Sequence, residues 1–304
     1  MSEKVYDLII TGAGPAGITA SVYAARKKMD FLVITKDVGG QATLSSEVEN
    51  YTGYQFITGP ELVQKFREHF EKFSVEMKEG EGVKLVEKKG DIVEVETDRG
   101  MYMAKTAIIA SGRVPRKLGV DGEDEFKNRG VTYCATCDAP LFADMNVAVI
   151  GGGNSALDAV LQLVKIANKI YVIDIAPRLS ADQIMVDKAK KDDKVIIYNS
   201  TKVEKIYGED FVKGLKIARS GKLQDIAVEG VFIEAGSYPA SDFVKGVKKN
   251  EYEEIIVNCN CETNIPAIFA AGDVTSVPAK QIIVACGEGA KAAMAVFEYI
   301  SKSQ

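Results

Sequence analysis

The pattern of apolar and polar residues is nearly the same in two stretches of the chain. In the first, an apolar run at 7–11 leads through glycines into an alanine-rich helical pattern at 18–28 and a second apolar run at 31–35. The second stretch has the same order, with apolar runs at 147–150 and 170–174. Short apolar runs on both sides of a helical pattern predict a strand, a helix and a parallel strand. Each stretch therefore predicts one βαβ unit.

The rest of the pattern places further strands and helices around these two units. Helices are predicted at 60–73, 181–191 and 281–300, and strands within 83–110 and around 195–198, 202–207, 214–218, 230–233 and 267–271. We therefore expect an α/β fold of two Rossmann-like (three-layer ββα-type) nucleotide-binding domains, the second inserted into the first. The expected domains are 1–114 with 247–304, and 115–246.

Both βα turns carry a glycine fingerprint. The sequences are Gly12-Ala13-Gly14-Pro15-Ala16-Gly17 and Gly151-Gly152-Gly153-Asn154-Ser155-Ala156. Their first and last positions share one offset of 139 residues (151 − 12 and 156 − 17), which indicates an internal duplication. In this motif the first glycine makes the turn, the second lets the backbone approach a pyrophosphate, and the third packs the helix against the strand. The helix N-terminus then faces the phosphates.

Residues at the ends of other strands predict contacts with ribose and flavin. Asp174 ends the second strand of the inserted unit, where a carboxylate binds a free ribose 2′-hydroxyl and repels a 2′-phosphate, so NADH is favoured over NADPH. Arg178 follows and weakens this inference, because arginine binds a 2′-phosphate. Thr35 stands at the equivalent position of the first unit and implies a different ribose contact. The loop Gly39-Gly40-Gln41 and the strand end Gly272-Asp273 are expected to contact the first nucleotide.

The sequence Cys134-Ala135-Thr136-Cys137-Asp138 indicates a redox-active thiol pair. Two cysteines at this spacing cycle between dithiol and disulfide by exchange. Asp138 is placed to donate and accept a proton beside them. With five cysteines and His69 as the single histidine, a structural zinc site is not expected. We interpret Cys259, Cys261 and Cys286 as bystanders.

Composition limits the remaining choices. The chain has 304 residues, 46% of them hydrophobic, and a net charge of −5. These values are typical of a globular protein and do not favour a nucleic-acid or membrane partner. A strand-like run begins at Val5, which leaves no signal peptide, and we expect a cytoplasmic protein.

In these motifs the chain resembles the low-molecular-weight thioredoxin reductases. The two fingerprints, the Cys134–Asp138 stretch, Gly39-Gly40-Gln41, Val48-Glu49-Asn50-Tyr51, Thr58-Gly59-Pro60 and Ala270-Ala271-Gly272-Asp273 carry the resemblance, in order, along essentially the whole chain. It implies FAD in the discontinuous domain, a pyridine nucleotide in the inserted one, a homodimer and a large rotation between domains. It also implies Cys137 as the thiol nearer the flavin and Asp138 as the acid/base, and leaves open which cysteine attacks the partner.

Two departures refine this expectation. Asp174 stands where the NADPH enzymes of that family have a run of basic residues, and this is similar to the NADH-dependent flavoprotein half of alkyl hydroperoxide reductase. Pro140-Leu141-Phe142 and Lys280-Gln281-Ile282-Ile283 are also similar to that flavoprotein, and we expect the last stretch to contact the cofactor. We expect no thioredoxin-like extension like that of this flavoprotein, and therefore expect a separate thioredoxin- or glutaredoxin-like partner. Ferredoxin or a deazaflavin as donor, and an NADH oxidase reducing oxygen, stay open as alternatives.

Overall fold

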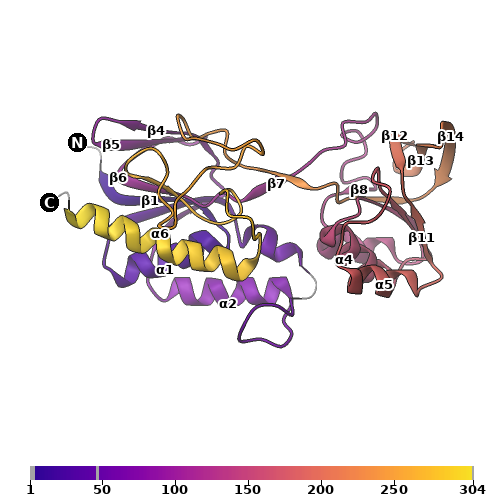
Figure 1. Ribbon diagram of the computed structural model, residues 1–304, viewed down its shortest axis with the longest axis horizontal. Coiled ribbons are helices and arrows are strands. Elements are labelled where there is room, and N and C mark those ends of the chain that lie inside the picture. The colour runs from indigo at the N-terminus through magenta and orange to yellow at the C-terminus, as the bar shows by residue number, and fades with distance from the viewer. Residues whose placement is uncertain (1–3, 46–47, 303–304) are drawn as a thin grey trace. The chain divides into compact units, whose positions relative to one another are not determined.

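The computed structural model describes residues 4–45 and 48–302, with the side chain of Cys137 left out. The chain forms two compact units, which Figure 1 shows with both chain ends in the first. The first unit comprises Met1–Val114 and Tyr238–Gln304, and the second comprises Pro115–Ser237. Two short paired strands, β7 (Arg113–Pro115) and β16 (Ser237–Pro239), carry the chain out and back. The chain returns at Tyr238, earlier than the expected residue 247.

The first unit is built on a seven-stranded sheet in the order β3-β2-β1-β6-β5-β4, with β17 also pairing β6. Its parallel strands are β1 (Val5–Ala13), β2 (Phe31–Val38), β3 (Glu76–Glu79), β6 (Met101–Ile109) and β17 (Ile268–Ala270). The antiparallel strands are β4 (Val83–Lys89) and β5 (Ile92–Thr97). The N-terminal half of β6 pairs β5 and its C-terminal half pairs β17, so one strand joins both parts of the sheet.

Alternate residues of β1 face two different layers. Leu8 and Ile10 pack with helices α1 (Pro15–Arg26) and α6 (Ile282–Lys302), which run side by side in Figure 1. Ile9 faces β4, β5 and the returning segment around Val244 and Ile255. Two more helical segments, α2 (Gly59–Glu71) and η1 (Gly40–Leu44), complete the helical side. The period of two thus gives a three-layer unit.

The second unit repeats this plan. Its parallel sheet has the order β11-β10-β9-β15-β8. The strands are β8 (Val131–Thr132), β9 (Asn146–Ile150), β10 (Lys169–Ile173), β11 (Val195–Tyr198) and β15 (Gly230–Ile233). One face packs on α4 (Asn154–Leu163) and α5 (Gln183–Lys190). The other packs on the antiparallel strands β12 (Thr201–Gly208), β13 (Val212–Arg219) and β14 (Lys222–Ala227). Both units are Rossmann-like, as the sequence predicts.

The duplication also holds at the level of helix starts. Pro15 begins α1 and Asn154 begins α4, at the same offset of 139 residues (154 − 15). The short helical segments α3 (Ala135–Asp138) and η2 (Ala139–Phe142) follow β8. Within residues 4–45 and 48–302, the helices are all too short or too polar to cross a membrane.

Candidate functional site

The first glycine of each fingerprint is required by the backbone itself. Gly12 has φ +99°, and a Cβ there would lie 2.4 Å from the Ala110 carbonyl oxygen. Gly151 has φ +135°, and its Cβ would lie 2.1 Å from the Glu234 oxygen. Positive φ strains any other residue, and these contacts leave no room for a side chain. Gly17 is also required, because a Cβ would lie 1.9 Å from the Gly12 oxygen.

The middle glycines are different, because the folded backbone has room for a side chain at either position. A Cβ on Gly14 would meet only the Gly39 oxygen, at 3.9 Å, and a Cβ on Gly153 only Ser180 Oγ, at 3.8 Å, among the described atoms. Their backbones are extended, with φ of −73° and −89°, which any residue adopts. A glycine with free space in front of it fits a ligand that approaches the backbone there.

Both glycines are also the N-caps of helices. In the described chain no side chain caps α1 at Gly14 or α4 at Gly153, so first-turn N–H groups point outward. By contrast α2 has a full capping box, in which Thr58 and Glu61 bond each other's backbone N–H groups. Helix starts that lack side-chain caps are suited to bind phosphate. Pro15 occupies the first turn of α1, and Ser155 is exposed in the first turn of α4 above the buried Ala156.

The hydroxyl group of Thr35 is hydrogen-bonded within the loop that follows the first glycine fingerprint. Its Oγ1 accepts from the Ala13 N–H at 3.2 Å and donates to the Asp37 carbonyl oxygen at 2.5 Å. Gly39 and Gly40 both have positive φ and turn the chain toward Gly14. A Cβ on Gly40 would lie 3.6 Å from Gly14 Cα, so this loop lines the same space.

The structure brings together predicted site residues that are distant in sequence. Asn50 Nδ2 donates to Gln281 Oε1 at 3.0 Å across 231 positions. Gln41 Nε2 donates to the Arg113 carbonyl oxygen at 2.7 Å. Ile282, next to Gln281, begins α6. The Gly39–Gln41 loop, the residue 50 region and the start of α6 therefore belong to one neighbourhood of the first unit.

Gly272 and Asp273 follow β17 directly. Gly272 has φ +79°, and its N–H donates to the carboxylate of the buried Glu288 at 2.7 Å. No described residue hydrogen-bonds the Asp273 carboxylate, although it is partly buried. Burial raises the pKa of Asp273, and the positive charges of Lys280 and Arg113 oppose the rise. An unbonded carboxylate at the end of a parallel strand is suited to accept a ribityl hydroxyl.

Two cations beside Asp273 share one acid. Glu254 Oε1 lies 3.0 Å from Arg113 Nη1 and 3.0 Å from Lys280 Nζ, and all three side chains are mostly buried. The Lys280 ammonium also donates to the Thr275 carbonyl oxygen. The sequence suggested Lys280 but not Glu254, Arg113 or Glu288, because these side chains lie in regions without a motif.

In the second unit, Asp174 lies against the glycine loop. A Cβ on Gly152 would be 1.9 Å from Asp174 Oδ2, and the Ala176 N–H donates to Asp174 Oδ1 at 3.2 Å. Asn154 forms a mutual pair with Asp182: its Nδ2 donates to Asp182 Oδ2 at 3.2 Å, and its Oδ1 accepts from the Asp182 N–H at 2.8 Å. The segment after Asp174 is thereby fastened to the start of α4.

The redox segment follows β8. Cys134 is disulfide-bonded, while Cys137, the other predicted cysteine, has its side chain outside the described residues. Thr132 Oγ1 donates to Asp138 Oδ2 and accepts from the Cys134 N–H at 3.1 Å. Tyr133 Oη donates to the buried Glu123 at 2.6 Å. The remaining cysteines, Cys259, Cys261 and Cys286, are free thiols.

These free thiols differ in exposure. Cys259 is exposed, whereas Cys261 and Cys286 are buried. Burial raises the pKa of Cys261 to about 11 and also raises the pKa of Cys286. Buried thiols of this kind are poor nucleophiles. The residues that the structure describes contain no group of three or more side chains able to hold a metal ion.

Glu234 is a further acid that sequence reasoning missed. It follows β15, and its N–H donates to the Ile150 oxygen at 2.8 Å. Burial, together with the negative charge of Asp158 on α4, raises the pKa of Glu234 to about 8. The sequence signal that could have identified Glu234 was its position at the end of a predicted strand. Folding places this strand end beside Gly151.

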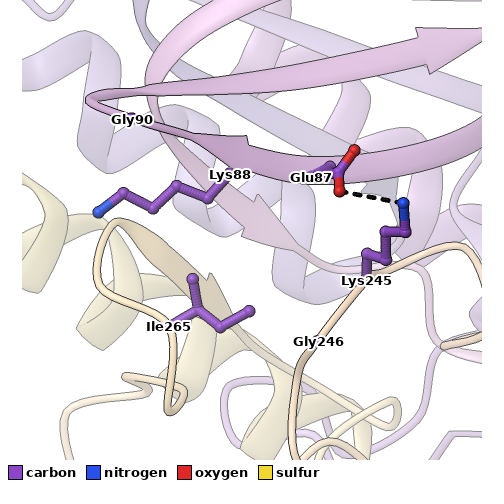
Figure 2. Close-up of a pocket in the computed structure, with 6 residues that line it drawn as sticks. All are labelled: Glu87, Lys88, Gly90, Lys245, Gly246 and Ile265. Atoms are coloured by element: carbon purple, nitrogen blue, oxygen red, sulfur yellow. Dashed lines mark ion pairs between the residues drawn. The ribbon is translucent and has the colours of Figure 1, made fainter.

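A separate open pocket of about 380 Å³ lies in the first unit, away from the glycine loop and the other predicted site residues. Figure 2 shows its lining, where Lys245 Nζ pairs Glu87 Oε1 at 3.0 Å. The lining residues are Glu87, Lys88, Gly90, Lys245, Gly246 and Ile265. None of these lining residues is a predicted site residue.

The chemistry of the first unit fits a bound dinucleotide. Gly14 offers an open backbone and α1 an uncapped start for a pyrophosphate, and Asp273 offers a carboxylate for a polyol. Gly153, α4 and Asp174 offer the same elements in the second unit. Each unit therefore has what a nucleotide needs at both its phosphates and its ribose.

Known proteins share this arrangement. An alkyl hydroperoxide reductase protein of Escherichia coli (strain K12) is 36% identical over 310 residues, covering 99% of this chain and 60% of that protein. A Bacillus subtilis (strain 168) protein named NADH dehydrogenase is 35% identical over 305 residues, with coverage of 99% and 60%. The chain thus spans about 60% of the length of these relatives.

Solved structures agree over the whole chain. The crystal structure of Lactococcus lactis thioredoxin reductase has 36% sequence identity and a TM-score of 0.92, covering 98% of this chain and 99% of that one. The sequence profile of the pyridine nucleotide-disulphide oxidoreductases matches residues 6–289, a span that includes both glycine loops and the redox segment. Because that match extends over both nucleotide-binding units, the chain belongs to the pyridine nucleotide-disulphide oxidoreductase family.

Proposed function

We propose that this chain is a flavin-dependent disulfide reductase. Electrons pass from NADH through FAD to the Cys134 disulfide and then to a thioredoxin- or glutaredoxin-like protein. The overall reaction consumes NADH, one proton and the partner disulfide, and yields NAD⁺ and the partner dithiol. FAD, when bound, supplies the redox centre that accepts a hydride and passes two electrons on. The disulfide of Cys134, which directly precedes a short helix ending at Asp138, is the observation that carries the proposal.

In the first unit, we assign FAD binding to three groups of residues. The Gly12–Gly17 loop and the start of α1 bind the pyrophosphate through backbone N–H groups. Asp273 accepts a hydrogen bond from a sugar or ribityl hydroxyl, and Lys280 and Arg113 keep positive charge beside it. The Asn50–Gln281 pair and the Gly39–Gln41 loop position the rest of the cofactor.

In the second unit, we assign NADH binding to the Gly151–Ala156 loop and Asp174. The Asp174 carboxylate is fixed by the Ala176 N–H and lies against Gly152, where a 2′-phosphate would meet its negative charge. Arg178 is exposed and no described acid pairs it, so NADPH is the less favoured donor rather than an impossible one.

At the thiol pair, Asp138 is the proposed proton donor and acceptor, and Cys137 the second thiol. Leu141, in η2 after Asp138, is 71% exposed. We also propose that the protein is a homodimer, which light scattering of the purified protein would test.

Parallel anaerobic titration tests the electron donor. The flavin absorbance of the purified protein is followed while NADH, NADPH or reduced ferredoxin is added. NADH is expected to bleach the flavin at the lowest concentration. Bleaching by NADPH alone would contradict the assignment of Asp174, and bleaching by ferredoxin alone would contradict the pyridine nucleotide.

Serine substitution tests the thiol pathway. Cys134→Ser is expected to abolish reduction of the aromatic disulfide DTNB and of thioredoxin, because the exchange needs this sulfur. Cys259→Ser, which replaces an exposed free thiol, is the matched control and is expected to retain both activities. Full disulfide-reductase activity in Cys134→Ser would refute the proposal.

A second candidate is direct NADH oxidation with oxygen as acceptor. The name NADH dehydrogenase of the Bacillus subtilis relative supports NADH as the donor in this candidate and names no acceptor. In that case oxygen consumption with NADH would be fast in the wild type and unchanged in Cys134→Ser, while disulfide reduction would be slow in both.

A further inference from the structure

Thr132 connects both ends of the redox helix through a single oxygen atom. Its Oγ1 accepts from the N–H of Cys134, just before α3, at 3.1 Å. The same oxygen donates to the carboxylate Oδ2 of Asp138, the last residue of α3. The Asp138 N–H in turn donates to the Cys134 carbonyl oxygen at 3.2 Å. These bonds close a ring around the turn that holds the cysteine pair.

The chemistry of a hydroxyl fixes the direction of these bonds. A threonine has one proton to donate, and its lone pairs accept. Because the N–H of Cys134 needs an acceptor, the hydroxyl proton is free for the Asp138 carboxylate. A donated hydrogen bond of this kind is directional and fixes the orientation of the carboxylate. Asp138 Oδ1 has no bond to any described residue and is left for proton transfer.

Thr132 itself has little freedom to move. It is only 6% exposed, and it ends β8, where it is registered with Phe232 of β15. The next residue, Tyr133, donates to Glu123, whose carboxylate also accepts from the N–H groups of Leu118 and Gly119 at 2.9 and 2.6 Å. The backbone at Thr132 is therefore held by its pairing in the sheet, and the side chain of the next residue is held by a buried acid.

We propose that Thr132 is a positioning residue that holds the Asp138 carboxylate, by its Oδ2, in the orientation for proton transfer to and from the thiol pair. This inference rests on the proposed disulfide-reductase function. In the step concerned, FAD, when bound and reduced, would supply two electrons and one proton to the S–S bond of Cys134. Asp138 would supply the second proton through Oδ1, so that both sulfurs become thiols, and would regain a proton from solvent.

The test compares Thr132→Val with Thr132→Ser. Valine has the shape of threonine without the hydroxyl, and serine keeps the hydroxyl without the methyl group. Turnover with NADH and DTNB is measured between pH 5 and 9, with flavin content recorded for each variant. For Thr132→Val we expect kcat to fall at least about tenfold, a fraction of what proton transfer by a positioned group contributes, with KM for DTNB unchanged. Thr132→Ser is expected to restore kcat across this pH range.

A double-mutant cycle separates positioning from general structural damage. If Thr132 acts through Asp138, then Thr132→Val adds no further loss in kcat to Asp138→Asn. Additive losses, or a Thr132→Ser variant as slow as Thr132→Val, would overturn the proposal. Should the valine variant fold poorly, Thr132→Ala serves as the second variant without a hydroxyl.

A partner-independent readout keeps this test distinct from that of the proposed function. In a Cys259→Ser background, the reduced protein is alkylated with iodoacetamide, and labelling of Cys134 is followed against pH. We expect the labelling profile of Thr132→Val to differ from that of the wild type, and that of Thr132→Ser to match it. A wild type that reduces no disulfide contradicts the proposed function alone, whereas identical labelling profiles contradict the role of Thr132.

Discussion

Glu234 is expected to make the stability of the protein depend on pH near neutrality. Its pKa is raised to about 8 in the folded protein, first by burial and then by the negative charge of Asp158, from an ordinary value of 4.5. The perturbation is Glu234→Gln, which keeps the shape of the side chain and removes its proton equilibrium. The effect follows from the difference in bound protons between the folded and unfolded chains.

The sign and the size follow from these two pKa values. Between pH 4.5 and 8 the folded protein retains a proton on Glu234 that the unfolded chain has lost. The free energy of unfolding therefore falls as the pH rises, by about 1.4 kcal/mol per unit for one proton. Between pH 6 and 8 the loss comes to about 2 kcal/mol, because Glu234 itself is half ionised at the upper limit. Glu234→Gln removes this dependence.

Urea denaturation, followed by circular dichroism at pH 6, 7 and 8, measures the free energy of unfolding of each protein. The quantity of interest is the free energy of unfolding of the wild type minus that of the variant. Glu209→Gln is the control, since Glu209 is an exposed acid of the same unit and stays ionised throughout this range. The free energy of unfolding of the wild type minus that of Glu234→Gln should fall by about 2 kcal/mol from pH 6 to 8. A difference that is the same at pH 6 and 8 would refute the reasoning.

Four further substitutions have definite expected outcomes. Gly14→Ala is expected to lose FAD but to keep the melting temperature of the FAD-free wild type, whereas Gly17→Ala is expected to lower that temperature, because only the second would push a Cβ to 1.9 Å from a backbone oxygen. Flavin absorbance per chain and calorimetry of the FAD-free proteins check both. Thr58→Ala removes the capping box of α2 and should cost about 1 kcal/mol in urea denaturation, without changing nucleotide binding. Asp174→Ser should raise kcat/KM for NADPH relative to NADH, because the carboxylate no longer opposes the 2′-phosphate; an unchanged ratio would contradict the role of Asp174.

The sequence predicted the units best where local geometry and long apolar runs coincide. The runs at 147–150 and 195–198 end where β9 and β11 end, and the offset of 139 residues recurs in the two helix starts. The polar strands β3 and β14 were missed, because a strand such as Glu76–Glu79 has no apolar alternation to identify it. Pairing with β2 and β13 makes these segments strands, and such pairing is not visible locally.

The candidate site shows the same division. The glycines carry their own signal, since each reflects a backbone requirement or an approaching ligand. Thr35 was expected to contact a ribose. Its hydroxyl bonds Ala13 and Asp37 within the loop, and the ribose contact stays a prediction. Glu254 pairs with Arg113 and Lys280, and Arg113 lies far from it in sequence, so no local motif marks this ion pair. Thr132 bonds two residues of the redox motif, but it lies before that motif and no pattern identifies it.

The paired strands β7 and β16 have a consequence for how the chain was assembled. They place the first and last residues of the inserted unit next to each other, with the Arg116 N–H bonded to the Gly236 oxygen and the Ala240 N–H to the Gly112 oxygen. A segment whose ends are neighbours behaves as a cassette, because it can be removed or exchanged without opening the host sheet. A different nucleotide or redox module could occupy the same place, and the flavin-type unit would keep its own core.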